Sequence, residues 1–250
     1  MTSALIAIHT IWLRSIKRYL RSKSRIIGSL AQPLFFLLIL GFGLGSVISG
    51  GTSYVTFLAP GIIAMSVMFT SIFSGIQIIW DKQFGFLKET LVAPISRTSI
   101  MIGQTLGGAT TAVIQGTIML IISFFIGTIH LTFIGLIIAY LFMILLGISL
   151  TALGIAIASR MEDMQGFQLV MNFAILPLFF LSGALFPLTS APAILRTISY
   201  FNPLSYGIEG IRYGLEGVSH IAPLTCFLVL VGFSAIVIFV GGYLFRRIKV

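Results

Sequence analysis

The sequence predicts an all-α integral membrane protein, and its composition is the first reason. Hydrophobic residues make up 58% of the 250 residues, charged residues make up 8%, and the mean hydropathy is +1.11. About a quarter of the residues in an ordinary soluble domain are charged. Too few polar side chains are therefore present to cover a water-soluble globule, so nearly the whole chain must lie in or beside lipid.

The second reason is the length of the apolar runs, six of which approach the roughly 20 residues that a helix needs to cross the hydrocarbon core. The expected spans are residues 27–47, 57–79, 100–127, 131–158, 167–186 and 222–245. No internal repeat is visible, so residues 1–250 are treated as a single transmembrane domain. Within it we expect an interfacial helix at 1–25, spans one to five at 27–186, short outer-face helices at 187–221 and the sixth span at 222–245.

The basic residues agree with six spans and set the orientation. In this arrangement thirteen of the 15 Lys and Arg fall on one side, and only Arg196 and Arg212 fall on the other. Lys and Arg are concentrated in the cytoplasmic loops of membrane proteins. Both termini are therefore expected in the cytoplasm, in a multi-pass protein of the cell (cytoplasmic) membrane. Topology then explains the net charge of +9, and no nucleic-acid partner is expected.

Residues 1–25 carry six basic residues and no acidic one. Apolar residues recur at helical spacing from Leu5 to Tyr19, and the basic residues lie mostly on the other side. Such a basic amphipathic helix is typical of the membrane interface, although calmodulin-type targets share the pattern. The adjoining span favours the interfacial helix. Its candidate residues are Trp12, Arg14, Lys17, Arg18 and Arg21.

The stretch 81–97 is where charge collects between two long apolar runs inside the chain. Its apolar residues fall at i, i+3 and i+7, on one face of a short helix. A proline ends the pattern, because its ring and missing N–H interrupt an α-helix. We predict a short amphipathic helix outside the bilayer core, and the alternative is a solvated loop that only joins two spans. The candidate residues are Phe84, Leu87, Lys88, Glu89, Leu91 and Pro94.

The segment 187–221 is too apolar for a solvated loop, although three prolines divide it. It predicts short helices that lie on, or re-enter, the outer leaflet. Asn202 is a good N-cap and Pro203 fits the first helical turn, so a helix is expected to begin there. Glu209 and Arg212 are spaced i, i+3 and could pair. An exposed pair of this kind would contribute little to stability.

The residue patterns of catalysis and cofactor binding are missing. No GxxxxGK[ST] phosphate loop occurs, and His, Cys and carboxylates do not form a metal-ligand cluster. The single Cys226 excludes a disulfide within the chain. The expected spans hold almost no ionisable side chain, which disfavours a proton-coupled carrier or a charge-lined pore. No catalytic, cofactor-binding or metal-binding residue is therefore expected, and the chain is not expected to be an enzyme.

Two motifs resemble those of ABC-2-type transporter permease subunits, in the daunorubicin-resistance and Nod-factor export branch. LKETLVAPISRTSIMIGQTL at 87–106 resembles the cytoplasmic motif of that family. NPLSYGIEGIRYGL at 202–215 is similar to its outer motif before the last span. The order of parts also agrees, so the resemblance covers nearly the whole chain. The outer motif supplies the candidate residues Asn202, Pro203, Tyr206, Glu209 and Arg212.

The resemblance implies the permease half of an ATP-driven exporter. Such a permease pairs with a separate ABC ATP-binding subunit, and two permeases, identical or homologous, assemble with two ATPases. Mg-ATP would bind to the partner subunit, and this chain would carry no cofactor. The stretch 81–97 would match the coupling helix that docks on the ATPase.

Members of this family move drugs, lipids, lipo-oligosaccharides and polysaccharides, and some confer multidrug resistance. The uncharged interior of the expected spans favours a hydrophobic or amphiphilic cargo, such as a drug, lipid or glycolipid. The alternative from another class is a passive channel, or a non-transporting membrane anchor that recruits a cytosolic protein.

Overall fold

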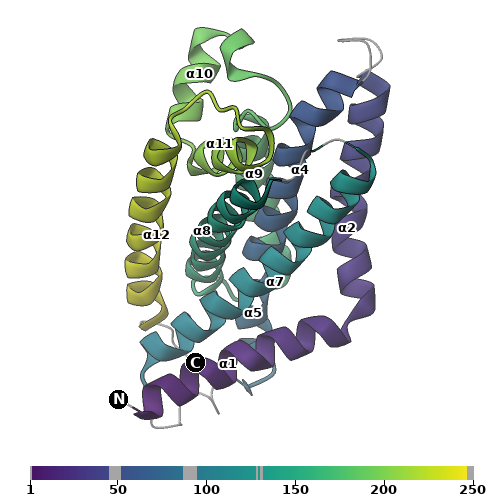
Figure 1. Cartoon of the computed structure of the whole chain (residues 1–250). Helices are drawn as coiled ribbons and strands as arrows, with labels where there is room; N and C mark the ends of the chain where they lie inside the picture. Colours follow the sequence, from purple (N-terminus) through teal and green to yellow (C-terminus); the bar gives the residue numbers. More distant parts are fainter. Residues whose placement is uncertain (1, 45–51, 87–94, 128, 130–131, 247–250) are drawn as a thin grey trace.

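The structure is a computed structural model that describes residues 2–44, 52–86, 95–127, 129 and 132–246 (Figure 1). Every regular element in that part of the chain is helical, as the composition predicted. The first half contains α1 (Thr2–Arg21), α2 (Lys23–Leu38), the π-helical η1 (Ile39–Leu44), α4 (Thr52–Phe73), α5 (Ile76–Gln83) and α7 (Arg97–Phe125). The second half contains α8 (Phe133–Ala158), α9 (Met164–Phe180), the 3-10 helix η2 (Leu188–Ser190), α10 (Ala193–Tyr200), α11 (Pro203–Glu216) and α12 (Pro223–Arg246).

Side-chain caps fix where four of these helices begin. Ser96 accepts a hydrogen bond from the backbone N–H of Ser99 at the start of α7. Thr132 and Asp163 accept in the same way at the starts of α8 and α9. Asn202 caps α11 by accepting from the N–H of Leu204. Each cap satisfies a backbone donor that the first helical turn leaves without a partner, so short polar side chains set these boundaries.

Among the residues that the structure describes, five helical stretches are long and apolar enough to cross a membrane. They are Lys23–Gly43, Tyr54–Gln83, Arg97–Phe125, Phe133–Ala158 and Pro223–Arg246. They coincide with five of the six expected spans. The expected span at 167–186 corresponds to α9, an apolar helix of 17 residues. At 1.5 Å per residue α9 is about 26 Å long, which is shorter than a hydrocarbon core of about 30 Å.

The helix α9 ends before residue 186 for a local reason. Its C-terminal turn closes at Leu181, and Gly183 then adopts a positive φ of 77° that an L side chain rarely takes. The chain leaves the helix there and crosses toward η2 and α10. The last residues of the expected fifth span are therefore a connection and not a helix.

The helix α4 lies at the centre of the bundle, in contact with α2, α7, α8 and α11. The helix α8 packs against α7, α11 and α12 on the other side of it. The helix α1 lies across one end of the bundle against α7, and both chain termini are at that end (Figure 1). The helix α10 is at the opposite end.

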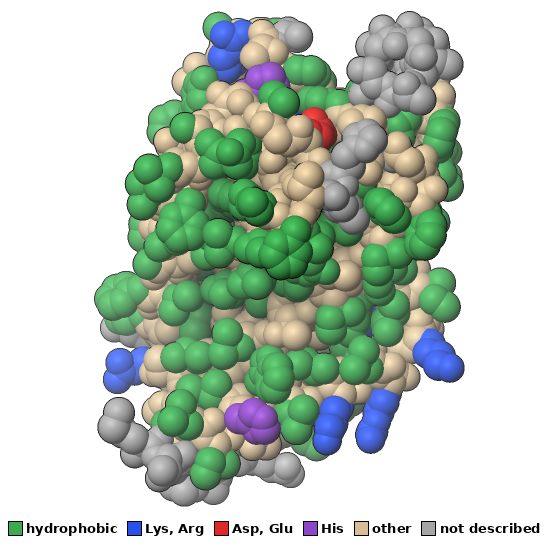
Figure 2. Space-filling view, viewed as in Figure 1, with side chains coloured by type: hydrophobic (Ala, Val, Ile, Leu, Met, Phe, Trp, Pro, Cys, Tyr) green, Lys and Arg blue, Asp and Glu red, His purple; other side chains and the backbone are tan. Residues whose placement is uncertain are grey.

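The side of the bundle is apolar, which suits a lipid environment. Figure 2 shows hydrophobic side chains over the middle of the visible face, with Lys and Arg gathered mainly at one end. Phe125, Phe173 and Phe239 belong to three different helices and are each about four-fifths exposed. Exposed large side chains in such number mark a surface that water does not cover. The chain is a multi-pass membrane protein.

The helix expected at 202–215 is confirmed, and it lies inside the bundle. The helix α11 packs against α4, α8 and α12, and most of its residues are buried. Gly207, Gly210 and Gly214 face α8, where the backbones of Gly214 and Gly135 come so close that a Cβ would not fit. The helix therefore enters the bundle from one end and does not rest on its surface.

Candidate functional site

The helix α1 reaches the bundle through close backbone contact with α7. A Cβ added to Gly103 would lie 3.0 Å from the Cβ of Ile11, and one added to Gly107 would lie 2.5 Å from the Cβ of Ser15. Gly103 and Gly107, four residues apart on α7, are the positions where α1 docks. Larger side chains there would force α1 away from α7.

Polar contacts fix α1 in its position along α7. The indole N–H of Trp12 donates to Thr110 Oγ1 over 3.0 Å. The hydroxyl of Tyr19, which is 3% exposed, donates to Gln115 Oε1. The expected apolar stripe of α1 is half-buried to buried from Ile8 to Tyr19, whereas Leu5 at its start is 67% exposed. Lys17 lies on the exposed part of the helix.

Arg14 and Arg18 converge on one carboxylate of α5. Arg14 Nη2 is 2.8 Å from Asp81 Oδ2, and Arg18 Nη1 is 4.0 Å from Asp81 Oδ1. Gln77 Nε2 donates to Asp81 Oδ1 over 2.6 Å. We call these four residues the Asp81 cluster. It joins α1 to α5, because two of its members belong to each helix.

Asp81 is buried, whereas the sequence placed it at the start of a stretch outside the bilayer core. The helix α5 continues to Gln83, so Asp81 still belongs to the bundle. Burial of a carboxylate is costly unless charged and hydrogen-bonding partners compensate for the lost water. Arg14 and Gln77 supply that compensation, since each donates to one oxygen.

A break between α4 and α5 brings Asp81 to this place. The helix α4 ends at Phe73 and α5 begins at Ile76. A Cβ added to Gly75 would lie 2.4 Å from the carbonyl oxygen of Gly154, so α8 touches the chain at the break. Only a residue without a side chain permits this approach. The direction of α5 is therefore set by a backbone contact with α8.

The end of α5 is tied to the connection between α8 and α9. Lys82 Nζ donates to the carbonyl oxygen of Met161 over 3.3 Å, and Gln83 Nε2 donates to that of Glu162 over 3.0 Å. Phe84 follows as the C-cap residue and is 67% exposed. Its ring lies against Trp80, with ring centroids 6.1 Å apart.

Phe84 is the first of the residues expected to contact a partner, and its exposure leaves it accessible. The other candidates lie outside the described residues: Leu87, Lys88, Glu89, Leu91 and Pro94. The expected helix at 81–97 is therefore described only at its two ends. Its first part continues the spanning helix, and Arg97 at its end donates to the carbonyl oxygen of Arg246 over 2.7 Å.

The second charged cluster lies on α11. Arg212 Nη1 donates to Glu209 Oε1, and each side chain is 3% exposed. The other carboxylate oxygen accepts from the N–H of His220 over 2.6 Å, and Arg212 Nη2 donates to the carbonyl oxygen of Gly183 over 3.2 Å. The guanidinium also lies 4.3 Å from the ring centroid of Phe57. We call these residues the Glu209 cluster. The expected i, i+3 pair is confirmed, and it is buried and not a surface pair.

The remaining outer-motif residues connect the ends of helices. Asn202 Nδ2 donates to the carbonyl oxygen of Leu178 over 2.6 Å, so the cap of α11 also holds the end of α9. The hydroxyl of Tyr206 donates to the carbonyl oxygen of Tyr200 over 2.7 Å. The motif at 202–215 thus fixes α9, α10 and α11 relative to one another.

Glu216 ends α11 beside this cluster with one carboxylate oxygen buried and without a hydrogen-bond partner. Burial raises the pKa of Glu216 to about 7; Arg212 counteracts this in part and Glu209 adds to it. In the described part of the chain, no group of three His, Cys, Asp or Glu could hold a metal ion.

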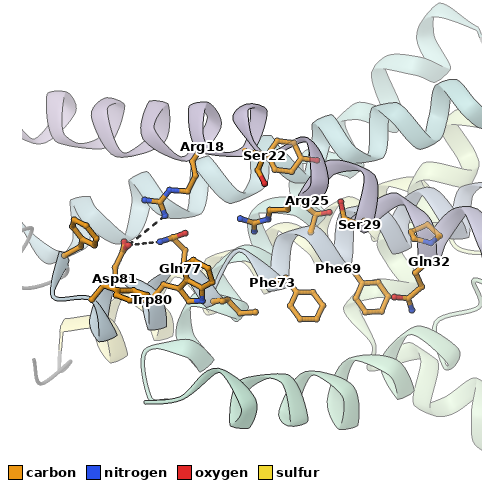
Figure 3. A pocket seen from close by; sticks show the side chains of 17 residues that line it. Arg18, Ser22, Arg25, Ser29, Gln32, Phe69, Phe73, Gln77, Trp80 and Asp81 are labelled. Carbon is orange, nitrogen blue, oxygen red and sulfur yellow. Dashed lines mark hydrogen bonds and ion pairs between the residues drawn. The ribbon is translucent and has the colours of Figure 1, made fainter.

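A cavity between α1–α2 and α4–α5 was not expected from the sequence. Its volume is about 730 Å³, and its lining includes Arg18, Arg25, Phe73 and Trp80 (Figure 3). Arg25 is the available signal, because it stands at the start of an apolar span. In the sequence, Arg25 counted only toward the basic helix at 1–25 and the orientation of the chain.

Comparison with known proteins identifies the family of this chain. Residues 6–215 match the ABC-2 type transporter family, which is most of the chain. The chain belongs to the ABC-2 type transporter family. It is therefore related to transport permeases, as the motifs at 87–106 and 202–215 predicted.

Three relatives illustrate the breadth of this permease family. The chain is 35% identical over 202 residues to the putative transport permease ycf38 of Porphyra purpurea, covering 77% of this chain and 68% of the relative. It is 29% identical to Nodulation protein J of Rhizobium leguminosarum bv. viciae, covering 83% and 81%. It is 28% identical to the inner membrane transport permease YadH of Escherichia coli K12, covering 91% and 90%.

Proposed function

We propose that this permease is the membrane subunit of an ATP-driven exporter and is powered by a separate ABC ATP-binding subunit. Membership of the ABC-2 family supports transport. One observation carries the mechanical part of the proposal. The Asp81 cluster links α1 to α5 a few residues before the stretch 87–94, so a force applied to that stretch acts on both helices.

We assign six spans to the chain, with α9 as the fifth. A helix about 26 Å long crosses a bilayer that thins locally around it, at a modest energetic cost. The basic residues favour a cytoplasmic location for both termini. In this arrangement α1 lies at the cytoplasmic interface, and α10 and α11 lie on the outer side. A reporter fused after Val250 should read cytoplasmic and one inserted at Ser190 external. A cytoplasmic signal at Ser190 contradicts this topology.

The partner ATPase is proposed to dock at residues 84–94. Phe84 supplies an exposed aromatic ring, and Leu87 and Leu91 continue the same face in the sequence. Lys88 and Glu89 fix the orientation at the rim. Buried apolar anchors contribute most of the affinity of such an interface, whereas charges at the rim contribute little. Mg-ATP binds the partner subunit.

The working unit contains a second permease copy or a homologous permease, as well as two ATPases. ATP-driven closure of the ATPases moves the stretch 84–94, tilts α4–α5 and α7, and opens the seam between permeases to the outside. A rigid-body change of this kind requires contacts that differ between two states. The Asp81 cluster is partly open to solvent and can exchange partners during this movement.

Substitution of Leu87 tests the docking surface. Leu87→Asp places a charge where the groove is apolar, at a cost on the order of several kcal/mol. We expect it to abolish co-purification of the ATPase and substrate-stimulated ATP turnover. Lys88→Ala is the matched control and should reduce both only slightly. Protease resistance of each variant in detergent reports whether the chain is folded.

The alternative function, a passive channel or membrane anchor, gives different results. A channel conducts its solute in vesicles without an ATPase. An anchor retains its cytosolic partner but does not move a solute. If Leu87→Asp inserts, folds, keeps the ATPase and transports normally, then 84–94 is a linker and the docking proposal is wrong.

A further inference from the structure

The cavity between α1–α2 and α4–α5 has two chemically distinct ends. Figure 3 shows Asp81 and Arg18 toward one end and Arg25 near the middle, whereas Phe69 and Gln32 lie toward the other end. Arg25 and Gln32 are seven residues apart on α2, so the cavity runs about 10 Å along that helix. Its volume of about 730 Å³ is within the range of small-molecule sites.

The charged end carries more positive charge than the nearby carboxylate balances. Arg14 and Arg18 both approach Asp81. Arg25 has no carboxylate within 4.0 Å among the residues that the structure describes. Arg18 and Arg25 both line the cavity, so two guanidinium groups face the same space. An anion placed between them would neutralise their charge.

The first turn of α2 also favours an anion at this end of the cavity. Ser22 is the N-cap residue of α2, but its side chain makes no capping hydrogen bond, and it lines the cavity together with Arg25. A helix N-terminus carries partial positive charge and free backbone donors. It suits an anion when side-chain cations face the same space, as they do here.

The other end of the cavity is apolar. Phe69, Phe73 and Ile76 form its wall on α4 and α5, and Trp80 lines the cavity near Asp81. Pro33 faces them from α2. This part of the cavity lies within two spanning helices, beside the exposed side chains of α2. It can hold a hydrocarbon chain, whereas a free inorganic anion would leave it empty.

A small side pocket adds a requirement for a hydrogen-bond donor. It measures about 40 Å³ and shares Arg18, Tyr19 and Arg25 with the main cavity. Gln104 lines it, is 7% exposed, and has a side-chain oxygen without a hydrogen-bond partner. A buried acceptor left unpaired is costly. A hydroxyl group on the ligand would satisfy it.

We propose that this cavity binds an amphiphile that has a phosphate or sulfate ester, a hydroxylated head group and a hydrocarbon chain. The charged ester lies between Arg18 and Arg25 at the start of α2, and the chain lies along Phe69 and Phe73. Arginine pairs with phosphate through two parallel hydrogen bonds, which lysine does not reproduce. Assignment of this ligand as the cargo rests on the proposed export function. The binding site itself does not.

Trp80 provides a direct test, because it is one of only two tryptophans in the chain. The full chain with Trp12→Phe is placed in phosphatidylcholine nanodiscs that contain either brominated phosphatidylglycerol or brominated phosphatidylcholine. Bromine quenches tryptophan fluorescence on contact. We expect phosphatidylglycerol to quench Trp80 at far lower mole fraction than phosphatidylcholine does.

Two substitutions that each remove one positive charge distinguish binding in the cavity from a general attraction of anionic lipid to the protein surface. Arg25→Gln should weaken the phosphatidylglycerol-dependent quenching about tenfold, since one charge-assisted interaction is lost. Lys23→Gln removes a positive charge two residues away on the exposed side of α2 and should leave quenching unchanged. Arg25→Lys keeps the positive charge and should retain part of the phosphatidylglycerol-dependent quenching. This result would show that a substitution at position 25 leaves the chain folded.

Equal quenching by the two brominated lipids in the parent protein overturns the proposal. An equal loss of quenching in Lys23→Gln and Arg25→Gln overturns it as well, because surface charge would then explain the result.

A second experiment identifies the source of the ligand. Short-chain phosphatidylglycerol should raise ATP turnover of the assembled transporter if this chemistry belongs to the cargo. Selective quenching without stimulation supports the site and assigns it to a bilayer lipid. Failure to recover an ATPase affects only the export function.

Discussion

The Glu209 cluster and the Asp81 cluster contain similar side chains in different surroundings. In the Glu209 cluster both charged side chains are 3% exposed, and backbone groups of Gly183 and His220 supply further hydrogen bonds. In the Asp81 cluster only the carboxylate is buried, and Arg14 and Arg18 are 37% and 42% exposed. Water can therefore replace an arginine at Asp81, whereas nothing replaces a partner at Glu209. Burial, and not residue type, decides which pair holds the fold together and which can rearrange.

The difference in solvent exposure between the two clusters also agrees with where each cluster lies in the fold. The Glu209 cluster fixes α11 to the connection after α9, which contains Gly183. The Asp81 cluster fixes α1 to α5, next to the proposed docking stretch. A permease that transmits movement from one end needs rigid attachment at the other. The two clusters supply these two properties with the same ionic chemistry.

The largest expected effect follows from removing one member of the Glu209 cluster. Arg212→Met leaves the carboxylate of Glu209 buried without its cation, so stability should fall by about 3–5 kcal/mol. The double variant Glu209→Gln with Arg212→Met removes both charges and should recover much of that loss. Thermal unfolding in detergent measures both. If the single variant unfolds at the temperature of the parent protein, the pair does not hold α11 in place.

A smaller effect on stability is expected at the Asp81 cluster. Asp81→Asn leaves two arginines that can turn toward water, so the loss should be about 1 kcal/mol. Coupling of transport to ATP turnover should suffer more than stability does. In a double-mutant cycle with Arg14→Ala, the interaction energy should also be about 1 kcal/mol or less. A loss as large as that of Arg212→Met would show that the two clusters do not differ as described.

The smallest effect concerns Glu216 and pH. Its pKa of about 7 in the folded protein lies above the ordinary value of 4.5, so the folded state retains a proton that the unfolded state releases. The stability that Glu216 contributes should be fully present below pH 4.5 and be lost as the pH rises through 7. Because Glu216 is partly exposed, the fall should be modest. Glu216→Gln should remove this part of the pH dependence. An unchanged melting curve between pH 5 and 8 in both proteins contradicts the assignment.

The sequence alone determined the class of protein, five of the spans and several helix boundaries. These features depend on local properties that neighbouring residues carry. Long apolar runs require lipid or a buried core, and Asn202 followed by Pro203 starts a helix in almost any surroundings. The family resemblance of the motifs at 87–106 and 202–215 was also readable without a structure, since it depends on the order of residues.

Only the tertiary structure decided where the charged groups lie. Asp81 looked solvated because it begins a charged stretch, but arginines 67 and 63 residues earlier in the chain surround it. Glu209 and Arg212 looked like a surface pair, but glycines on α11 let the helix sink against α8. The cavity likewise depends on how α1 and α2 are placed against α4 and α5. Each outcome results from contacts between segments far apart in sequence, and hydrophobic periodicity carries no information about which segments will meet.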